Sequence, residues 1–274
     1  MIANYHTHTK RCHHAVGEDR EYVEAAIQSG LKILGFADHC PWVYPRKGFV
    51  SGIRLAPGEF DGYFYSLESL KREYEKDIKI YIGFETEHCM DMIPAQEELL
   101  KGYPLDYMIL GQHFLKAEYE SFYTGRPHAD EVFLRDYVDT VIAGIQSGRY
   151  LYPAHPDLIH FTGEEGVYAT HMKRLCEALK EADIPVEINV LGLSERRQYP
   201  SGRFLALAQK TGNKAIIGID AHSPEQLLNS EGIANAVALC KEYGLPLVDG
   251  DLLAEKGNCS VQAESLADEA VKKR

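Results

Sequence analysis

The chain has 274 residues, of which 45% are hydrophobic and 26% are charged, as is typical of a globular protein with one large or two small α/β domains. Its formal net charge of −12 disfavours a nucleic-acid partner, because binding the phosphate backbone requires a basic face. The first residues lack a basic and apolar leader, and no run of about 20 apolar residues occurs, so we expect a cytoplasmic protein without a membrane partner.

Short apolar runs alternate with longer amphipathic stretches along the chain. The apolar runs predict buried strands at residues 2–8, 33–38, 78–85, 107–111, 150–154, 185–189 and 215–220, with a weaker one at 245–248. The amphipathic stretches predict helices at residues 19–29, 59–76, 131–146, 166–182, 202–210 and 224–243. This repeated order favours a parallel sheet with crossover helices, as in a distorted (β/α) barrel, with a doubly wound open sheet as the alternative.

Metal-binding residue types follow the predicted strands one after another. The first strand ends in His6-Thr7-His8, and alternation along a strand puts both histidines on the same face. The ends of later strands carry Asp38 with His39, Glu85, His113, His155, and Asp220 with His222. Because the carboxyl ends of parallel strands form the active-site face of α/β proteins, we expect these side chains to gather there.

The types and number of these ligands restrict which metal ions the site can bind. Imidazole suits zinc, iron and other first-row metals, and carboxylates can bridge ions, whereas magnesium or calcium favours an all-oxygen cage. The ligands are too many for one tetrahedral ion, so two or three divalent transition-metal ions (Zn, Fe or Mn) are expected. Such clusters suit phosphoester hydrolysis by a metal-activated hydroxide. No nucleophile elbow, P-loop or dinucleotide fingerprint competes with this interpretation.

Taken together, these motifs resemble those of the PHP (polymerase and histidinol phosphatase) superfamily. The matching segments are His6-Thr7-His8-Thr9, Cys12-His13-His14-Ala15, Phe36-Ala37-Asp38-His39, Gly83-Phe84-Glu85, Leu110-Gly111-Gln112-His113, Ala154-His155-Pro156-Asp157 and Gly218-Ile219-Asp220-Ala221-His222. The resemblance implies an α/β fold of the distorted (β/α)7, TIM-like barrel type, with parallel strands and the active site at their C-terminal ends. We expect this barrel as a single domain over residues 1–254, followed by a polar tail over residues 255–274.

When the ligand positions of the family are matched to this sequence, the resemblance also implies that the ligands are divided among three metals. The first metal would be held by His6, His8, Glu85 and Asp220, the second by Glu85, His113 and His155, and the third by His14, His39 and His222. Only the resemblance points to His14, which lies beyond the first strand. Glu85 and Asp220 would be catalytic through the metals. Asp38 is a candidate either to orient a ligand or to protonate the leaving alkoxide.

Within the superfamily, the chain resembles most the histidinol-phosphate phosphatases. This resemblance rests on the length of the chain, which suits a stand-alone phosphatase, and on the long loop after Cys40. It also rests on two segments, Glu187-Ile188-Asn189 and Tyr199-Pro200-Ser201. It implies hydrolysis of a small phosphorylated metabolite, L-histidinol phosphate, to L-histidinol and phosphate in histidine biosynthesis. Since a guanidinium can bind phosphate through two N–H groups, Arg197, Arg196 and Arg54 are candidate phosphate contacts, and Asn189 is a candidate to line the pocket.

Three alternatives stay open. A PHP phosphoesterase for another small phosphate ester or a short oligonucleotide would differ only in its pocket. An amidohydrolase-type metal hydrolase would share the H-x-H motif, but such enzymes usually have a bridging carboxylated lysine, and no strand-end lysine stands out. A metal-storage or metal-sensing protein would show no turnover. The sequence predicts neither the native metal nor the oligomeric state.

Overall fold

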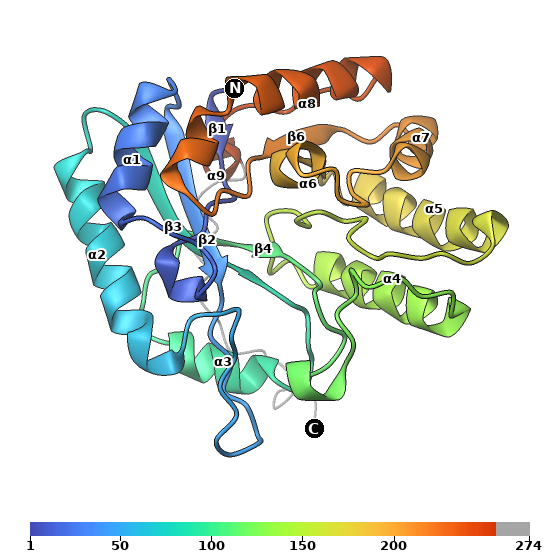
Figure 1. The fold of residues 1–274 in the computed structure, drawn as a ribbon, viewed down its shortest axis with the longest axis horizontal. Coiled ribbons are helices and arrows are strands. Elements are labelled where there is room, and N and C mark those ends of the chain that lie inside the picture. The colour runs from blue at the N-terminus through green and yellow to red at the C-terminus, as the bar shows by residue number, and fades with distance from the viewer. Residues whose placement is uncertain (256–274) are drawn as a thin grey trace, which may run out of the picture.

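Parallel strands form the centre of the computed structural model, which describes residues 1–255, and helices surround them (Figure 1). The strands are β1 (Ala3–Asn4), β2 (Ile33–His39), β3 (Lys79–Thr86), β4 (Tyr107–Leu110), β5 (Val186–Asn189) and β6 (Ala215–Gly218). They pair in chain order as β1-β2-β3-β4 and as β5-β6, and every pair is parallel. A doubly wound sheet would reverse its strand order at a switch point, so this order excludes that alternative.

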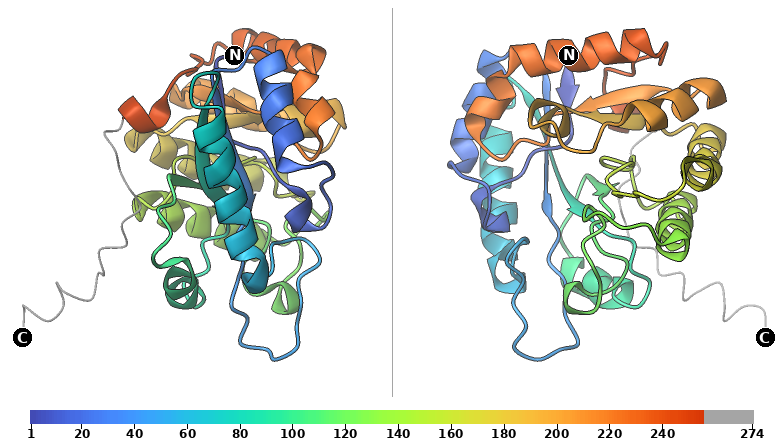
Figure 2. Two further views of the ribbon diagram at one scale, coloured as in Figure 1. Left: turned by 90° about the vertical axis from the view of Figure 1, so that its left-hand side faces the viewer. Right: turned by 45° about the vertical axis from the view of Figure 1, so that its right-hand side comes forward.

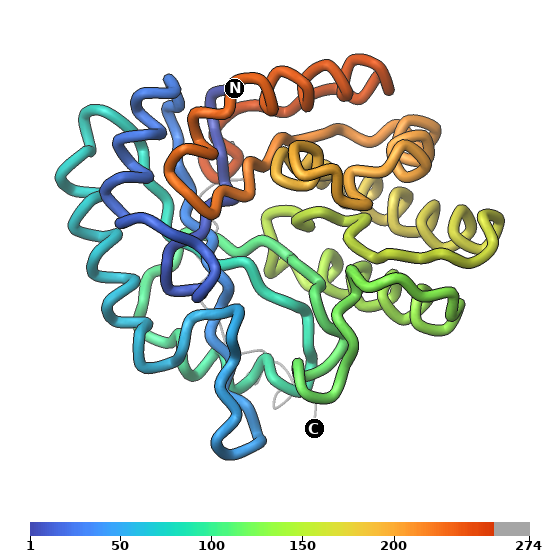
Figure 3. The backbone as a smooth tube through the Cα atoms, in the orientation of Figure 1, coloured from blue at the N-terminus to red at the C-terminus, as the bar shows by residue number. Residues whose placement is uncertain are grey.

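The sheet curls into a half-barrel with its helices on the outside (Figure 2). Isolated parallel bridges extend the pairing beyond the strands, from Thr7 to Ala221 and from Leu110 to Pro153. The first of these bridges joins the chain beyond β1 to the chain beyond β6. Over residues 1–255, the smooth backbone trace follows the same curved path (Figure 3). The expected α/β fold with a parallel, curved sheet is confirmed.

Two predicted strands are reduced to single bridges. In the segment 150–154, Leu151 N donates to Met108 O at 2.7 Å and Ala154 N donates to Leu110 O at 3.0 Å. Between them Pro153 has no N–H group and cannot complete a regular ladder. Residues 245–248 likewise contribute only the bridge between Ala215 and Leu247. The segments lie where strands were predicted, but their pairing is too short to form named strands.

The helices cover the outer side of the sheet. They are α1 (Asp19–Gln28), α2 (Phe60–Glu73), α3 (Ile93–Leu100), α4 (Glu131–Gln146), α5 (Glu165–Glu181), α6 (Val190–Ser194), α7 (Gly202–Thr211), α8 (Ser230–Glu242) and α9 (Leu252–Glu255). Short 3-10 helices are η1 (Lys10–Cys12), η2 (Pro57–Glu59), η3 (Glu118–Glu120) and η4 (Pro224–Leu228). The predicted helix 224–243 divides into η4 and α8 at Asn229, whose side chain caps α8. Over residues 1–255, no helix is long and apolar enough to cross a bilayer.

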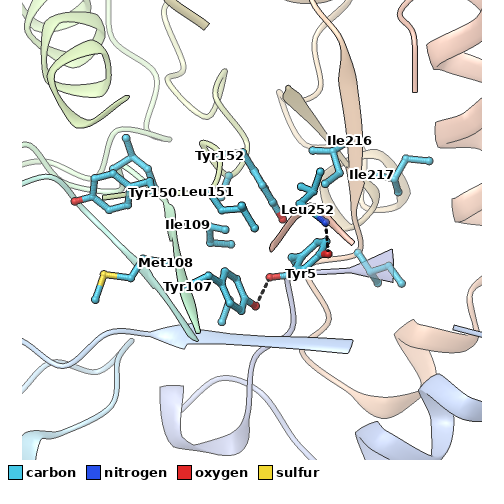
Figure 4. Packing of buried hydrophobic residues seen from close by; sticks show 14 of the residues in the cluster. Tyr5, Tyr107, Met108, Ile109, Tyr150, Leu151, Tyr152, Ile216, Ile217 and Leu252 are labelled. Carbon is cyan, nitrogen blue, oxygen red and sulfur yellow. Dashed lines mark hydrogen bonds between the residues drawn. The ribbon is translucent and has the colours of Figure 1, made fainter. Parts of the chain in front are cut away.

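Aromatic and aliphatic side chains fill the space between the strands (Figure 4). The Tyr107 hydroxyl donates to Tyr5 O at 2.7 Å, and Leu252 N donates to the Tyr5 hydroxyl at 2.9 Å. The second bond ties α9 to the chain that follows β1. The interior is thus a packed core that holds the strand ends in fixed positions. The polar tail expected over residues 255–274 lies outside the described residues from residue 256 onward.

Candidate metal centre

The candidate site is centred on the Glu85 carboxylate, one residue before the end of β3. Glu85 is 0% exposed, and neither of its oxygens accepts a hydrogen bond from the residues that the structure describes. Imidazole nitrogens face them instead. Oε2 lies 3.1 Å from His39 Nδ1 and 3.5 Å from His8 Nε2, and Oε1 lies 2.9 Å from His155 Nε2 and 3.4 Å from His113 Nε2. Because a buried carboxylate without hydrogen bonds is costly, the donor set fits bound cations.

A second carboxylate, Asp220, completes the inner part of the site. Its Oδ1 lies 3.3 Å from His6 Nε2 and 3.1 Å from His8 Nε2. Ligand atoms of His6, His8 and Glu85 lie within 4.8 Å of one another, as do those of His6, His155 and Asp220. Each group could therefore surround an ion, and the four residues that the family resemblance assigns to the first metal come together.

A more exposed group lies beside the inner one. Ligand atoms of His14, His39 and His222 lie within 4.8 Å of one another, and the Nε2 atoms of His14 and His222 are 3.0 Å apart. Cys12, at the end of η1, is buried within the same distance of His8 and His222. The structure thus brings together all nine predicted ligands, with His14 placed by the turn after η1.

Two of the ligands have backbone conformations that side-chain-bearing residues rarely adopt. The φ angle is +31° at His155 and +58° at Asp220, both in the left-handed region. Such conformations cost of order 1–3 kcal/mol each and cluster at functional sites. Their presence at two candidate ligands supports a functional role for this part of the structure.

Electrostatics favours the metal-binding protonation state at some of the ligands only. At His6, His8 and His155, burial lowers the imidazole pKa, but nearby carboxylates outweigh it and raise the pKa above its usual value, so metal binding there has to displace a proton. Burial raises the pKa of the Glu85 carboxyl, but the imidazoles of His113 and His39 outweigh it and hold the pKa well below its usual range. Burial, followed by the effect of nearby His8, lowers the pKa of His222 to about 3. Ionised carboxylates and neutral imidazoles are the forms that bind metals.

Glu187, on β5, lies behind the inner histidines. Its carboxylate lies 2.8 Å from His6 Nδ1 and accepts hydrogen bonds from His155 N at 2.7 Å and Asn189 Nδ2 at 2.9 Å. Asn189 Nδ2 also lies 3.1 Å from Asp220 Oδ2. Asn189, expected to line the pocket, is therefore buried against a candidate ligand. A Cβ atom on Gly218 would overlap the Glu187 carboxylate, so this position requires glycine.

Asp38 lies on the other side of the His8 ring from Glu85. Its Oδ1 is 3.6 Å from His8 Nδ1 and accepts a hydrogen bond from His39 N at 2.8 Å, while the Thr9 hydroxyl donates to Oδ2. The carboxylate is completely buried. This position favours the orienting role predicted for Asp38 over protonation of a leaving group.

The three candidate arginines have different surroundings. Arg54 is 2% exposed, and its terminal nitrogens lie 2.8 and 3.0 Å from the two Glu87 oxygens. Arg197 donates to the Tyr199 hydroxyl at 3.0 Å, and the Tyr199 ring lies 5.3 Å from the His155 ring. Arg196 is exposed, with a φ angle of +55°. Of the three, Arg197 lies close to a candidate ligand and retains exposure to solvent.

The sequence did not single out Glu187 or Glu87 as site residues. Their spacing in the sequence could have identified them as site residues. Glu87 lies two residues after Glu85, and Glu187 lies two residues before Asn189. Residues two apart on a strand lie on the same face. The alternation rule therefore applied to Glu187 and Asn189 on β5, whereas Glu87 lies just beyond β3, which ends at Thr86.

Comparisons with known proteins point to one family. The PHP domain family matches residues 4–190. A Deinococcus radiodurans protein named probable histidinol-phosphatase is 26% identical over 237 residues, 82% of this chain and 88% of its own. A Schizosaccharomyces pombe protein with the same name is 26% identical over 257 residues, 83% of this chain and 82% of its own. The structure of a Lactococcus lactis histidinol phosphate phosphatase complexed with Zn, L-histidinol and phosphate has the same fold (TM-score 0.68, 19% identity, covering 90% of this chain and 95% of that chain).

Proposed function

This chain belongs to the PHP domain family, and we propose that it is a metal-dependent phosphomonoesterase that hydrolyses L-histidinol phosphate to L-histidinol and phosphate. The match also confirms the superfamily resemblance expected from the motifs. The observation that carries the proposal is the buried Glu85 carboxylate, which faces five imidazoles within 3.6 Å and accepts no hydrogen bond from the described residues. The substrate is supported by two relatives named probable histidinol-phosphatase, each aligned over more than 80% of this chain.

The residues present fit two or three divalent transition-metal ions, of zinc, iron or manganese, because imidazole and carboxylate ligands are mixed. The proposed ligands are His6, His8, Glu85 and Asp220 for the first ion, Glu85, His113 and His155 for the second, and His14, His39 and His222 for the third. Close grouping of ligand atoms supports the first and third sets most directly. When bound, such ions polarise phosphoryl oxygens and neutralise negative charge that develops in the transition state.

The protein's own groups hold this arrangement in place. Glu187 fixes the orientation of the His6 ring and of the backbone at His155, and Asn189 holds Asp220. Asp38 supports His8 from its Nδ1 side. Carboxylates of this kind fix the tautomer and raise the basicity of the histidines that they contact.

Arg197 is the proposed phosphate contact. Its guanidinium carries a positive charge beside Tyr199, whose ring packs against the candidate ligand His155. A guanidinium can bind two phosphate oxygens at once. Arg196, one residue earlier, stays a weaker candidate because its described surroundings include no other site residue.

We also propose the finer fold expected from the sequence, a distorted (β/α)7, TIM-like barrel as one domain over residues 1–254. In support, His39 ends β2, Glu85 lies near the end of β3 and Asp220 follows β6, so these ligands come from the carboxyl ends of strands. The bridges at Pro153 and Ala221 continue the sheet around the site. The predicted cytoplasmic location stays a prediction.

Hydrolysis of a substrate panel tests the proposed function, measured as phosphate release for the phosphomonoesters and by product chromatography for the other substrates. The purified protein, loaded with zinc or manganese, is given histidinol phosphate, nucleoside monophosphates, a short oligonucleotide, and an amide and a lactone substrate. We expect kcat/KM to be highest for histidinol phosphate. Faster turnover of nucleotide phosphates or the oligonucleotide would favour another PHP phosphoesterase, and turnover of the amide or lactone alone would favour an amidohydrolase.

A further inference from the structure

Glu87 is a buried carboxylate that the mechanism above does not use. It follows the last residue of β3 and is 1% exposed. Its Oε2 accepts hydrogen bonds from Trp42 Nε1 at 3.0 Å and from a terminal nitrogen of Arg54 at 3.0 Å. Its Oε1 accepts from the other terminal nitrogen of Arg54 at 2.8 Å. Both donors belong to residues 40–58, the long loop predicted from sequence, which we call the 40–58 loop.

The same carboxylate faces a proposed metal ligand. Glu87 Oε1 lies 3.3 Å from His113 Nδ1, while His113 Nε2 lies 3.4 Å from Glu85 Oε1. The imidazole thus lies between two carboxylates, one facing each ring nitrogen. Histidines that bind metals usually donate their other N–H group to a carboxylate, a backbone carbonyl or a water molecule, and this partner fixes the ring orientation.

We infer that Glu87 is the positioning carboxylate for His113, and that the 40–58 loop holds Glu87 in place through Trp42 and Arg54. This inference rests on the proposed function, because it requires His113 to bind a metal. It gives Arg54 a role two contacts away from the metal rather than on the substrate phosphate. The loop, which projects from the body of the protein, is thereby connected to the metal centre (Figure 2).

The surroundings of Arg54 agree with this role. Its terminal nitrogens face Glu87, one of them also lies 3.4 Å from Cys40 O, and its Nε lies 3.5 Å from Glu118 Oε2. A guanidinium that is buried, with both terminal nitrogens bonded to Glu87, is poorly placed to bind a substrate phosphate. A buried ion pair adds little net stability over apolar packing, so the presence of one here fits a need for a fixed carboxylate.

Glu118 provides a matched control. It belongs to the same network, because it accepts hydrogen bonds from Ser51 Oγ at 2.9 Å and from the Tyr44 hydroxyl, and it faces Arg54. Its carboxylate has no contact with His113 among the interactions recorded for residues 1–255. Loss of the Glu118 charge removes a contact to Arg54 Nε but leaves the two bonds from the terminal nitrogens of Arg54 to Glu87, and the carboxylate facing His113 Nδ1, in place.

The test is zinc titration of the full-length protein in competition with a chromophoric chelator. In Glu87→Gln, we expect one zinc equivalent to bind about 10- to 100-fold more weakly, the usual effect of losing such a carboxylate, with the other equivalents unchanged. Glu118→Gln should bind all equivalents as the wild type does. Arg54→Lys, which keeps the charge but loses the planar fork, should weaken the same equivalent to a smaller degree.

Thermal unfolding of the metal-free proteins shows which variants are folded. Unchanged zinc affinity in a folded Glu87→Gln protein would overturn the inference. If Glu87→Gln does not fold, unchanged affinity in Arg54→Lys would do so. A wild-type protein that binds no zinc, or that binds zinc but releases no phosphate from histidinol phosphate, would instead contradict the proposed function.

Discussion

Replacing Glu187 with glutamine tests whether this buried carboxylate holds the inner ligands. Glu187 is 1% exposed and lies within 2.9 Å of three nitrogens, His6 Nδ1, His155 N and Asn189 Nδ2. Glutamine keeps the shape of the side chain but replaces one acceptor oxygen with an NH₂ group. At least one buried donor then loses its acceptor, which costs about 1–3 kcal/mol. The melting temperature of the metal-free protein should fall by roughly 5 °C.

Zinc binding gives the second half of this test. Because the variant no longer fixes the His6 ring, we expect the affinity of its site for zinc to fall about 10- to 100-fold. Glu181→Gln, which makes the same change at an exposed position on α5, is the control and should leave both quantities unchanged. A Glu187→Gln protein that melts and binds zinc as the wild type does would refute the role given to this carboxylate.

Three further predictions follow from the same site. In Gly111→Ala, the new Cβ would overlap the Glu85 carboxylate, so bound metal measured by elemental analysis should fall, whereas Gly58→Ala adds its Cβ in open space and should bind metal normally. Removing metal with a chelator should abolish phosphate release and lower the melting temperature, because ligands at 100 times their Kd stabilise a protein by about 2.7 kcal/mol per site. Arg197→Ala should lower kcat/KM for histidinol phosphate by roughly 10- to 100-fold, which corresponds to the loss of one hydrogen bond to a charged group. Arg196→Ala should change kcat/KM little. Equal effects of the two substitutions would contradict the assignment of Arg197 as the phosphate contact.

Local signals predicted the helices well where capping and periodicity agreed. The helix predicted at 131–146 has the same bounds as α4, where the Asp130 side chain accepts a hydrogen bond from Val132 N at 2.8 Å. The helix predicted at 202–210 differs from α7 by one residue, because Ser201 caps its start and Gly212 follows its end with a φ of +77°. Such ends depend on a few neighbouring residues and can therefore be inferred from sequence.

Other elements depend on contacts that a local pattern does not contain. Pro153 lies inside an apolar run that predicts a strand, and its missing N–H leaves a single bridge. The periodicity of 224–243 continues across Asn229, where the chain instead changes from η4 to α8. α3 and α6, with 8 and 5 residues, are too short for a periodic pattern to stand out.

The positions of the metal ligands were more predictable than those of their supporting groups. Strand-end placement suffices to bring His6, Glu85 and Asp220 together, because parallel strands share one carboxyl edge. His14 lies beyond the strand in a turn after η1, so only the family resemblance pointed to it. The position of Arg54 depends on the path of the whole 40–58 loop. That path places its guanidinium against Glu87, although the sequence alone predicted an arginine available to phosphate.

Metal analysis of the wild type and of Glu85→Ala, coupled to phosphate release from histidinol phosphate, tests the central claim most directly. Glu85 faces five imidazoles from 2.9 to 3.6 Å away, so its loss should remove at least one metal equivalent and reduce turnover to near background. Glu181→Ala serves as the exposed control. A Glu85→Ala protein that keeps its full metal content and near wild-type turnover would contradict the proposed metal centre.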